Sequence, residues 1–167
     1  MKLLILSDIH HEKQRAIQII EKYIDVDLIV SLGDSGLKQD FFETYDIIAI
    51  KGNAPFDFGI GYEHDMTIDN HNILFTHGHK YHVRRDLSET YKKLMPKTYD
   101  IVFYGHTHEA NYEKIQNTLF INPGAIHKSR GQIAESYGIA TFKPNKLIFK
   151  WLDAKTHALL HEIRTDL

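Results

Sequence analysis

Metal-binding residue types recur in this chain directly after short apolar segments. The motifs, in chain order, are Asp8-Ile9-His10, Gly33-Asp34, Gly52-Asn53, His77-Gly78-His79 and Gly105-His106-Thr107-His108. Carboxylate, imidazole and amide oxygen together favour divalent ions such as manganese, iron and zinc. The chain has 12 histidines and no cysteine, so any metal must be bound through nitrogen and oxygen rather than thiolate.

The donors in these motifs are numerous enough to hold two metal ions. The seven candidate ligands are Asp8, His10, Asp34, Asn53, His77, His106 and His108. One ion of this kind does not take so many ligands, so we expect a pair of ions ~3.5–4 Å apart, as in two-metal phosphatases. Such a pair binds a phosphate group and lowers the pKa of a water between the ions. That chemistry is the hydrolysis of phosphate esters.

Each motif taken alone has a simpler explanation. An aspartate after a strand often caps the next helix, and a lone histidine there is commonly a polar loop residue. Gly52-Asn53 by itself is a common turn. Acceptable ligands at five strand ends in succession are much harder to explain separately. We therefore interpret the motifs as one site beyond the carboxyl ends of the strands, where open α/β sheets bind ligands.

The first part of the chain has the pattern of parallel strands joined by helices. Short runs rich in Leu, Ile and Val predict buried strands. Ala16, Ile17, Ile20 and Ile24 recur at helical spacing. We predict strands over 2–7, 28–32 and 47–50, and helices over 13–23 and 39–44. This alternation favours parallel pairing through right-handed crossovers.

The rest of the chain is richer in strands. We predict a hairpin of 65–68 and 73–76 around a turn at 69–72, and a helix over 85–94 that Pro96 ends. Further predicted strands are 101–104, 112–115, 119–121, 137–142 and 147–152, with turns at 117–118 and 144–145 and a final strand or edge segment over 157–163. The pattern predicts one α/β domain over residues 1–167, with two sheets in contact and helices outside.

Composition and charge limit the classes of partner. A formal net charge of -2 provides no basic field for nucleic acid or an anionic membrane. No apolar run approaches the ~20 residues of a membrane helix, and Met1 to Leu6 is too short for the apolar part of a signal peptide. We expect a cytoplasmic protein that acts on a small phosphate ester, with no nucleic-acid or membrane partner. A homo-oligomer is compatible with the sequence.

In this order, the motifs resemble those of the calcineurin-like metallophosphoesterase superfamily, and more narrowly its small single-domain bacterial and archaeal phosphodiesterases. The resemblance runs from Lys2 to about Gly124. It implies an α/β fold, a four-layer α-β-β-α sandwich of two mixed sheets flanked by helices. It also implies two divalent metal ions, with manganese favoured and nickel, zinc, iron or magnesium as alternatives.

The resemblance further implies how the site residues divide. One metal takes Asp8, His10 and His108, the other takes Asn53, His77 and His106, and Asp34 bridges both. The implied activity is that of a phosphodiesterase, in which a hydroxide between the metals attacks phosphorus in line. Asp34, Asn53 and His79 are the predicted catalytic residues.

The chain departs from the family after Asn53. Many relatives have a His directly after this Asn, which helps to protonate the leaving group, and the small phosphodiesterases often have Cys-Asp. Ala54-Pro55 cannot donate a proton. We predict His79 as the substitute, with His11, His82 or a metal-bound water as alternatives; His79 could equally only orient a neighbouring ligand. Without a strong acid, the site should prefer esters with good leaving groups.

Two other segments near the motifs have less specific interpretations. Lys80, Arg84 and Arg85 are interpreted as solvated surface in preference to phosphate contacts. The turn Asn122-Pro123-Gly124-Ala125 resembles a family turn that often ends in Ser, so this chain lacks that hydroxyl.

Two further functions are compatible with the same resemblance. One is a nuclease, which the net charge and the lack of a basic stripe disfavour. The other is an interaction scaffold, because a eukaryotic retromer subunit resembles this fold yet has lost catalytic competence. A retired site tends to lose ligands, whereas all seven positions here carry metal-binding residues. The sequence leaves the natural substrate and the physiological metal open.

Overall fold

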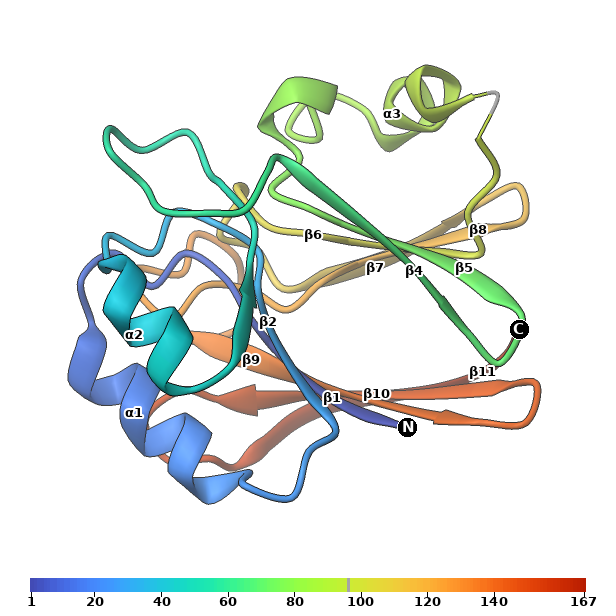
Figure 1. The fold of residues 1–167 in the computed structure, drawn as a ribbon. Helices are drawn as coiled ribbons and strands as arrows, with labels where there is room; N and C mark the ends of the chain where they lie inside the picture. The colour runs from blue at the N-terminus through green and yellow to red at the C-terminus, as the bar shows by residue number, and fades with distance from the viewer. Residues whose placement is uncertain (96) are drawn as a thin grey trace.

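Two mixed β-sheets pack face to face in the computed structural model, and helices cover their outer faces (Figure 1). The layers follow the order helix, sheet, sheet, helix, which confirms the predicted four-layer α-β-β-α sandwich. The structure describes residues 1–95 and 97–167. Pro96, which was predicted to end a helix, lies outside the described residues.

The first sheet has the strand order β11-β10-β9-β1-β2-β3. Its parallel part is β1 (Lys2–Leu6), β2 (Leu28–Ser31) and β3 (Ile47–Ala49), connected by α1 (Lys13–Lys22) and α2 (Gln39–Thr44). Its antiparallel part is β9 (Ser136–Lys143), β10 (Lys146–Asp153) and β11 (Leu159–Asp166). Strand β1 joins the two parts, because it pairs parallel with β2 and antiparallel with β9.

The second sheet has the strand order β4-β5-β6-β8-β7. Its elements are β4 (Glu63–Ile68), β5 (His71–Thr76), β6 (Ile101–Tyr104), β7 (Asn111–Ile115) and β8 (Thr118–Asn122). Strands β5, β6 and β8 are parallel, and the outer strands β4 and β7 pair antiparallel with them. A short 3₁₀ helix, η1 (His79–Tyr81), follows β5, and α3 (Leu87–Leu94) covers the outer face of this sheet.

Strand β1 is apolar from Leu3 to Leu6, where both of its faces are buried. Leu3 and Ile5 belong to the core between the sheets, whereas Leu4 and Leu6 pack in a second core with residues of α1 and α2. A third core, which includes Leu74, lies between the second sheet and α3. A strand covered on both faces has no solvent side that polar residues could occupy.

The turns differ from the prediction by one or two residues. Strand β5 begins at His71, so the turn before it is only Asp69-Asn70, and both residues have positive φ, 49° and 66°. Asp and Asn tolerate this conformation, which two-residue hairpin turns require. The next predicted turn lies at Gln116-Asn117 rather than at 117–118, and the turn at 144–145 is confirmed.

Other element ends also differ from the prediction. Helix α3 begins at Leu87 rather than at 85, because the Asp86 carboxylate caps it by accepting from Ser88 N at 2.7 Å. Ile24, expected on the apolar stripe of the first helix, lies beyond the end of α1 and is 90% exposed. The final strand is shifted from 157–163 to β11, since His157 lies before the strand and has left-handed backbone with φ of 61°.

Both chain termini lie at the same end of the first sheet, at the amino end of β1 (Figure 1). The strand register shows this directly, because Lys2 pairs with Thr141, Thr141 with Ile148, and Ile148 with Arg164. The predicted motifs follow the opposite, carboxyl end of β1.

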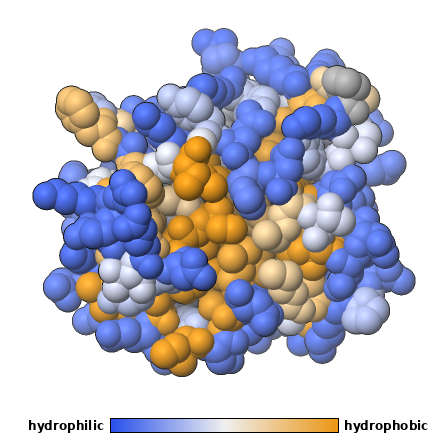
Figure 2. Space-filling model, viewed as in Figure 1, coloured by the Kyte–Doolittle hydropathy of each residue, from blue (hydrophilic) through white to orange (hydrophobic). Residues whose placement is uncertain are grey.

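The surface is mostly hydrophilic, and Figure 2 shows hydrophobic side chains in the middle of one face. They lie between the two sheets on the side where β3 and β4 are the edge strands. Within the described residues, no helix has the length and apolar character needed to cross a membrane.

Candidate metal centre

The predicted motifs come together beyond the carboxyl ends of strands from both sheets. Asp8 and His10 follow β1, Asp34 follows β2, His77 follows β5, and the last motif follows β6. Five candidate ligands have left-handed backbone, with φ between 43° and 69°: Asp8, His10, Asp34, His106 and His108. Non-glycine residues rarely adopt this conformation, and it concentrates at functional sites.

The first donor group consists of Asp8, His10 and His108. The Nε2 atoms of His10 and His108 lie 3.2 Å apart. Asp8 Oδ1 is 3.1 Å from His108 Nε2 and 3.8 Å from His10 Nε2. Three donor atoms therefore converge within a space that one cation would fill.

The second donor group consists of Asp8, Asp34 and His77, so Asp8 belongs to both groups. His77 Nε2 lies 3.4 Å from Asp34 Oδ2 and 3.2 Å from Asn53 Oδ1. Asp8, and not Asp34, is the residue that the two groups share. The role of Asp34 as the bridge between two metals therefore stays a prediction.

Asp8 has one satisfied oxygen and one that lacks a hydrogen bond. Oδ2 accepts from Ser7 Oγ at 2.6 Å and from His106 N at 3.0 Å. Oδ1 is buried and has no hydrogen-bond partner. A buried carboxylate oxygen without a partner is costly, and a bound cation would remove that cost.

Two histidines present Nε2 to the carboxylates in a fixed orientation. Nδ1 of His108 lies 2.9 Å from Lys128 O, and Nδ1 of His77 lies 2.8 Å from Leu32 O. Since a carbonyl only accepts, each Nδ1 must carry the proton, and Nε2 of the neutral ring has a lone pair. A lone pair that faces a carboxylate oxygen is repelled unless a cation lies between them. The donor set therefore fits divalent metal ions.

Without a cation, the same contacts favour protonated rings and ionised carboxylates. Burial lowers the pKa of His77 and His108, but Asp34 and Asp8 respectively raise these pKa values above the ordinary one. Burial raises the pKa of Asp8 and Asp34, and their histidine neighbours bring both well below the usual range. The metal-free site thus carries strongly coupled charges.

His106 and Asn53 lie at the margin of the two groups. The His106 ring centroid is 5.1 Å from that of His77, and burial together with the charge of His77 lowers the pKa of His106 to about 4. Asn53 is exposed, and its Oδ1 contacts His77 Nε2. Both side chains therefore lie beside His77 of the second group.

The three histidines considered as proton donors are placed differently. The ring of His79 lies 5.4 Å from His77 and 6.1 Å from His106, and its buried Nδ1 has no hydrogen-bond partner. His11 and His82 are exposed, and no hydrogen bond or ring contact among the described residues links either side chain to the two donor groups. The structure therefore brings only His79 to the site.

Asp57 supports the site and was missed by sequence reasoning. Its buried carboxylate accepts from the backbone N–H groups of Asp34, Ser35, Gly36 and Gly52 at 2.8–3.2 Å, and from the Ser35 hydroxyl at 2.9 Å. It thereby ties the loop after β2 to the loop after β3. The only signal in the sequence is an aspartate shortly after Gly52-Asn53, which is too common to notice.

Gly52 allows these two loops to approach closely. A Cβ at this position would collide with the Asp34 carboxylate and with the Asp34 backbone nitrogen. The glycine of this motif is therefore required by the contact with Asp34 rather than by its own turn.

Comparison with known proteins agrees with this geometry. A family model described as a calcineurin-like phosphoesterase superfamily domain matches residues 1–145. The chain belongs to the calcineurin-like phosphoesterase superfamily. At the level of the family, it is a metal-dependent phosphoesterase.

Two relatives of this phosphoesterase carry related names. The probable metallophosphoesterase YsnB of Bacillus subtilis is 30% identical over 154 residues, which cover 92% of this chain and 91% of the relative. The phosphodiesterase MJ0936 of Methanocaldococcus jannaschii is 32% identical over 144 residues, which cover 74% of this chain and 83% of the relative.

Solved structures share the fold of this phosphoesterase. A predicted phosphoesterase from Streptococcus pneumoniae has a TM-score of 0.87 at 23% identity, over 99% of this chain and 97% of the other. Vps29 of Entamoeba histolytica, complexed with zinc, has a TM-score of 0.77 at 17% identity, over 99% of both chains. At these identities, the likeness concerns the fold alone.

Proposed function

We propose that this chain is a phosphodiesterase that binds two divalent metal ions, with manganese favoured. The proposed ligands are Asp8, His10, Asp34, Asn53, His77, His106 and His108. The observation that carries the proposal is the pair of donor groups that share Asp8, in which histidine Nε2 atoms face carboxylate oxygens. A relative named as a phosphodiesterase supports the choice of diesters over monoesters.

The residues of the chain would hold and orient the reacting groups. When bound, the two ions would bind the phosphate oxygens and lower the pKa of a water between them. Asp34 is proposed as the bridging ligand, with Ala54 N donating to its Oδ1 at 2.7 Å to fix its direction. Asn53 would contribute its Oδ1, which already lies beside His77 Nε2.

We propose His79 as the residue that protonates the leaving group. Its buried Nδ1 has no hydrogen-bond partner, so this nitrogen is not engaged by another residue of the described chain. Burial lowers the pKa of His79, and the charge of His77 lowers it further. A ring that is mostly neutral near pH 7 donates weakly, which agrees with a preference for good leaving groups.

The alternative functions are a scaffold and a nuclease. The Vps29 structures share the fold, which gives the scaffold some support. Against it, all seven positions keep metal-binding residue types, and an interaction protein has no need of an unpartnered buried carboxylate oxygen. The net charge of -2 continues to disfavour a nuclease.

The experiment is turnover by chelator-stripped protein that is reconstituted separately with manganese, nickel, zinc and magnesium. The substrates are an aryl phosphodiester, an aryl phosphomonoester and cyclic nucleotides, with metal content measured by elemental analysis. We expect the aryl diester to be cleaved with at least one ion and no turnover in the chelator. His77→Ala should lose metal and activity, whereas His161→Ala, on β11, should keep both. Full turnover by metal-free protein would overturn the proposal.

A further inference from the structure

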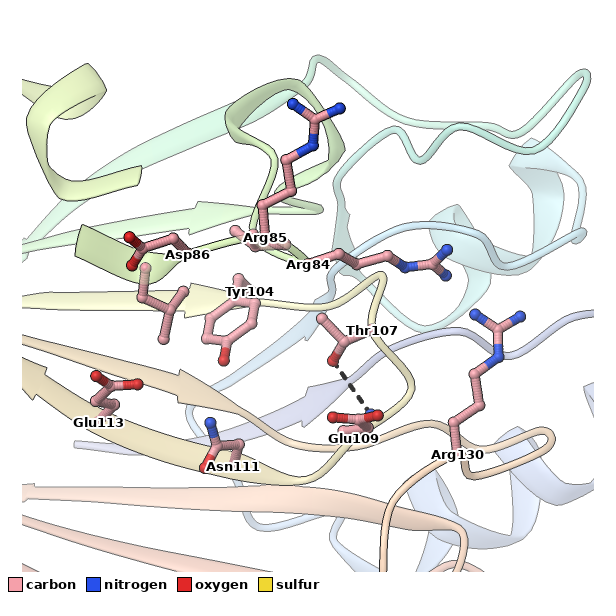
Figure 3. Close-up of a pocket in the computed structure, with 11 residues that line it drawn as sticks. Arg84, Arg85, Asp86, Tyr104, Thr107, Glu109, Asn111, Glu113 and Arg130 are labelled. Carbon is pink, nitrogen blue, oxygen red and sulfur yellow. Dashed lines mark hydrogen bonds between the residues drawn. The ribbon is translucent and has the colours of Figure 1, made fainter. Parts of the chain in front are cut away.

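A cavity of about 540 Å³ opens beside the loop from His106 to His108 (Figure 3). Thr107, in the middle of this loop, lines the cavity, and the segment from Val83 to Leu87 lies across from it. None of the seven proposed metal ligands, all of them in the described part of the chain, is among the lining residues. A group bound there would lie next to the metal-bound phosphate rather than in its place.

Arg84 and Arg130 bring guanidinium groups to the end of the cavity nearest this loop. Arg84 Nη2 donates to His106 O at 2.8 Å, and Arg130 N donates to His108 O at 3.0 Å, so both residues are attached to the same loop. Figure 3 shows the two guanidinium groups extending to the same side of Thr107. Neither forms an ion pair with a carboxylate in the described residues.

Both arginines are attached to the loop that carries two of the proposed metal ligands, His106 and His108. Two unpaired guanidinium groups beside a phosphate site have the geometry and charge to bind a further anion.

The other end of the cavity has hydrogen-bond acceptors. Glu113, Asn111 and Asp86 lie there, away from the two guanidinium groups (Figure 3). Tyr104 lies between the two ends of the cavity. Carboxylate and amide oxygens accept from hydroxyl groups, which suits the sugar of a nucleotide rather than an apolar group.

One carboxylate does lie near the arginines. Glu109 also lines the cavity, but its side chain makes no ion pair with Arg84 or Arg130. The Thr107 hydroxyl accepts from Glu109 N and from Asn122 Nδ2, which leaves its proton free to donate to a ligand. The end of the cavity near Thr107 therefore has two guanidinium groups, one hydroxyl and one carboxylate, and this carboxylate forms no ion pair with either arginine.

We propose that this cavity binds a second anionic group of the substrate through Arg84 and Arg130, and that the preferred substrates are phosphodiesters of a sugar or nucleoside that carries another phosphate. The inference rests on the proposed phosphodiesterase function. It changes the interpretation of Arg84, which the sequence indicated as solvated surface. Arg85 fits that earlier interpretation, since its guanidinium points away from Thr107 (Figure 3).

The test uses two substrates that differ only in the second phosphate. They are thymidine 5′-(4-nitrophenyl phosphate) and the same compound with a 3′-phosphate, so the scissile bond and leaving group are identical. We expect the metal-loaded protein to favour the 3′-phosphate compound about tenfold in kcat/KM, mainly through KM, as one charge-assisted contact allows. Equal kcat/KM for the two substrates would overturn the inference.

Substitutions identify the residues responsible. Arg130→Gln should bring the ratio of kcat/KM for the two substrates to about one, and Arg130→Lys should keep part of it. Arg84→Gln should lower the ratio in the same way. It should also lower kcat/KM for both substrates, because the Arg84 side chain donates a hydrogen bond to His106 O. Arg85→Gln is the control and should leave the ratio unchanged. If Arg130→Gln lowered kcat/KM equally for both substrates, Arg130 would instead contact the scissile phosphate or stabilise the fold.

A binding measurement separates this inference from the proposed function. Calorimetry on the metal-loaded protein compares thymidine 3′,5′-bisphosphate with thymidine 5′-phosphate. Tighter binding of the bisphosphate that Arg130→Gln removes supports the cavity, even if neither nitrophenyl ester is hydrolysed. In that case only the phosphodiesterase proposal fails. Equal affinity for the two nucleotides would overturn the cavity proposal, whether or not the nitrophenyl esters are hydrolysed.

Discussion

Asp8 is the residue on which the two donor groups depend. It is fully buried, and its Oδ2 is held by Ser7 and by the backbone of His106 while Oδ1 faces the histidine nitrogens. Oδ2 is thus used for hydrogen bonds within the protein, and Oδ1 remains available to a cation. The capacity of Asp8 to bind a cation therefore depends on how the surrounding backbone orients this one carboxylate oxygen.

Asp34→Asn should remove most activity and weaken the binding of at least one ion. A carboxylate that bridges two ions supplies charge and two equivalent oxygens, and an amide supplies neither. The check is metal content by elemental analysis beside turnover of an aryl phosphodiester. Two retained ions with near-normal turnover would show that Asp34 is not the bridge, and Asp8, which both donor groups share, would then be the candidate.

Asp57→Asn should lower stability and metal affinity although Asp57 is not a proposed ligand. The amide nitrogen would face backbone N–H groups of Asp34 or Gly52, and leaving such buried donors unsatisfied costs ~1–3 kcal/mol. Denaturant unfolding and a titration of activity with manganese measure the two effects, and excess manganese should restore part of the activity. Asp25→Asn, at an exposed position, is the control. An unchanged metal titration in Asp57→Asn would contradict the positioning role.

The sequence predicts the candidate metal ligands better than it predicts the residues that support them. Asp8 and His108 belong to short motifs at strand ends, so local pattern is enough to select them. Asp57 acts on backbone groups 21 to 23 residues earlier in the chain, and its effect depends on a contact between two loops. No local pattern contains that contact, so only the structure reveals it.

At the scale of elements, the loop after β3 is where the site lacks a proton donor. Strand β3 ends at Ala49, and the following residues bring Asn53 and Ala54 to the centre before Asp57 anchors the loop. Ala54 donates its backbone N–H to Asp34, so any residue other than proline there could keep this bond. The position can therefore accept a side chain without losing its structural contact.

Ala54→His should extend activity to esters with poorer leaving groups. An imidazole next to Asn53 could protonate a departing alkoxide, which the present loop cannot do. The measurement is a series of phosphodiesters of rising leaving-group pKa, and we expect the dependence of kcat on this pKa to become shallower. Ala54→Gln, similar in size but without a titrating group, is the control. Equal slopes for the two variants would argue against acid catalysis from this loop.

The sequence predicted the existence of the elements better than their ends. Apolar runs such as Leu3–Leu6 in β1 are unambiguous, because burial on both faces leaves no solvent side for polar residues. The ends depend on caps and turns, and the Asp86 cap and the Asp69-Asn70 turn each moved a boundary by one or two residues. Ile24 fits the helical spacing but lies beyond the end of α1, since periodicity alone does not say where a helix stops.

At the scale of the whole molecule, the buried histidines make the stability of the metal-free protein depend on pH. Burial lowers the pKa of His10, His79 and His106 below 6.5. As the pH falls below that value, these histidines are protonated in the unfolded chain before they are protonated in the folded protein. The free energy of unfolding therefore decreases. His77 and His108 have raised pKa values, so their contribution is complete below 6.5 and is lost as the pH rises through the folded values.

The metal-free protein should therefore be most stable near pH 6.5. Asp8 and Asp34 do not alter this optimum, because their lowered pKa values remove stability only when the pH falls below 3.8. Thermal unfolding in a chelator at about pH 5, 6.5 and 8 tests the expectation. A melting temperature that rises steadily from the lowest to the highest pH would contradict it.

The prediction of one domain over 1–167 and of a possible homo-oligomer stays open, but the position of the termini has a practical meaning. Both ends of the chain lie at the amino end of β1, and the metal centre lies at its carboxyl end. A five-residue strand separates them, a span of ~17 Å. This chain, attached to a bead, an electrode or a sensor chip through Met1 or Leu167, would keep the face with the two donor groups turned toward the solution.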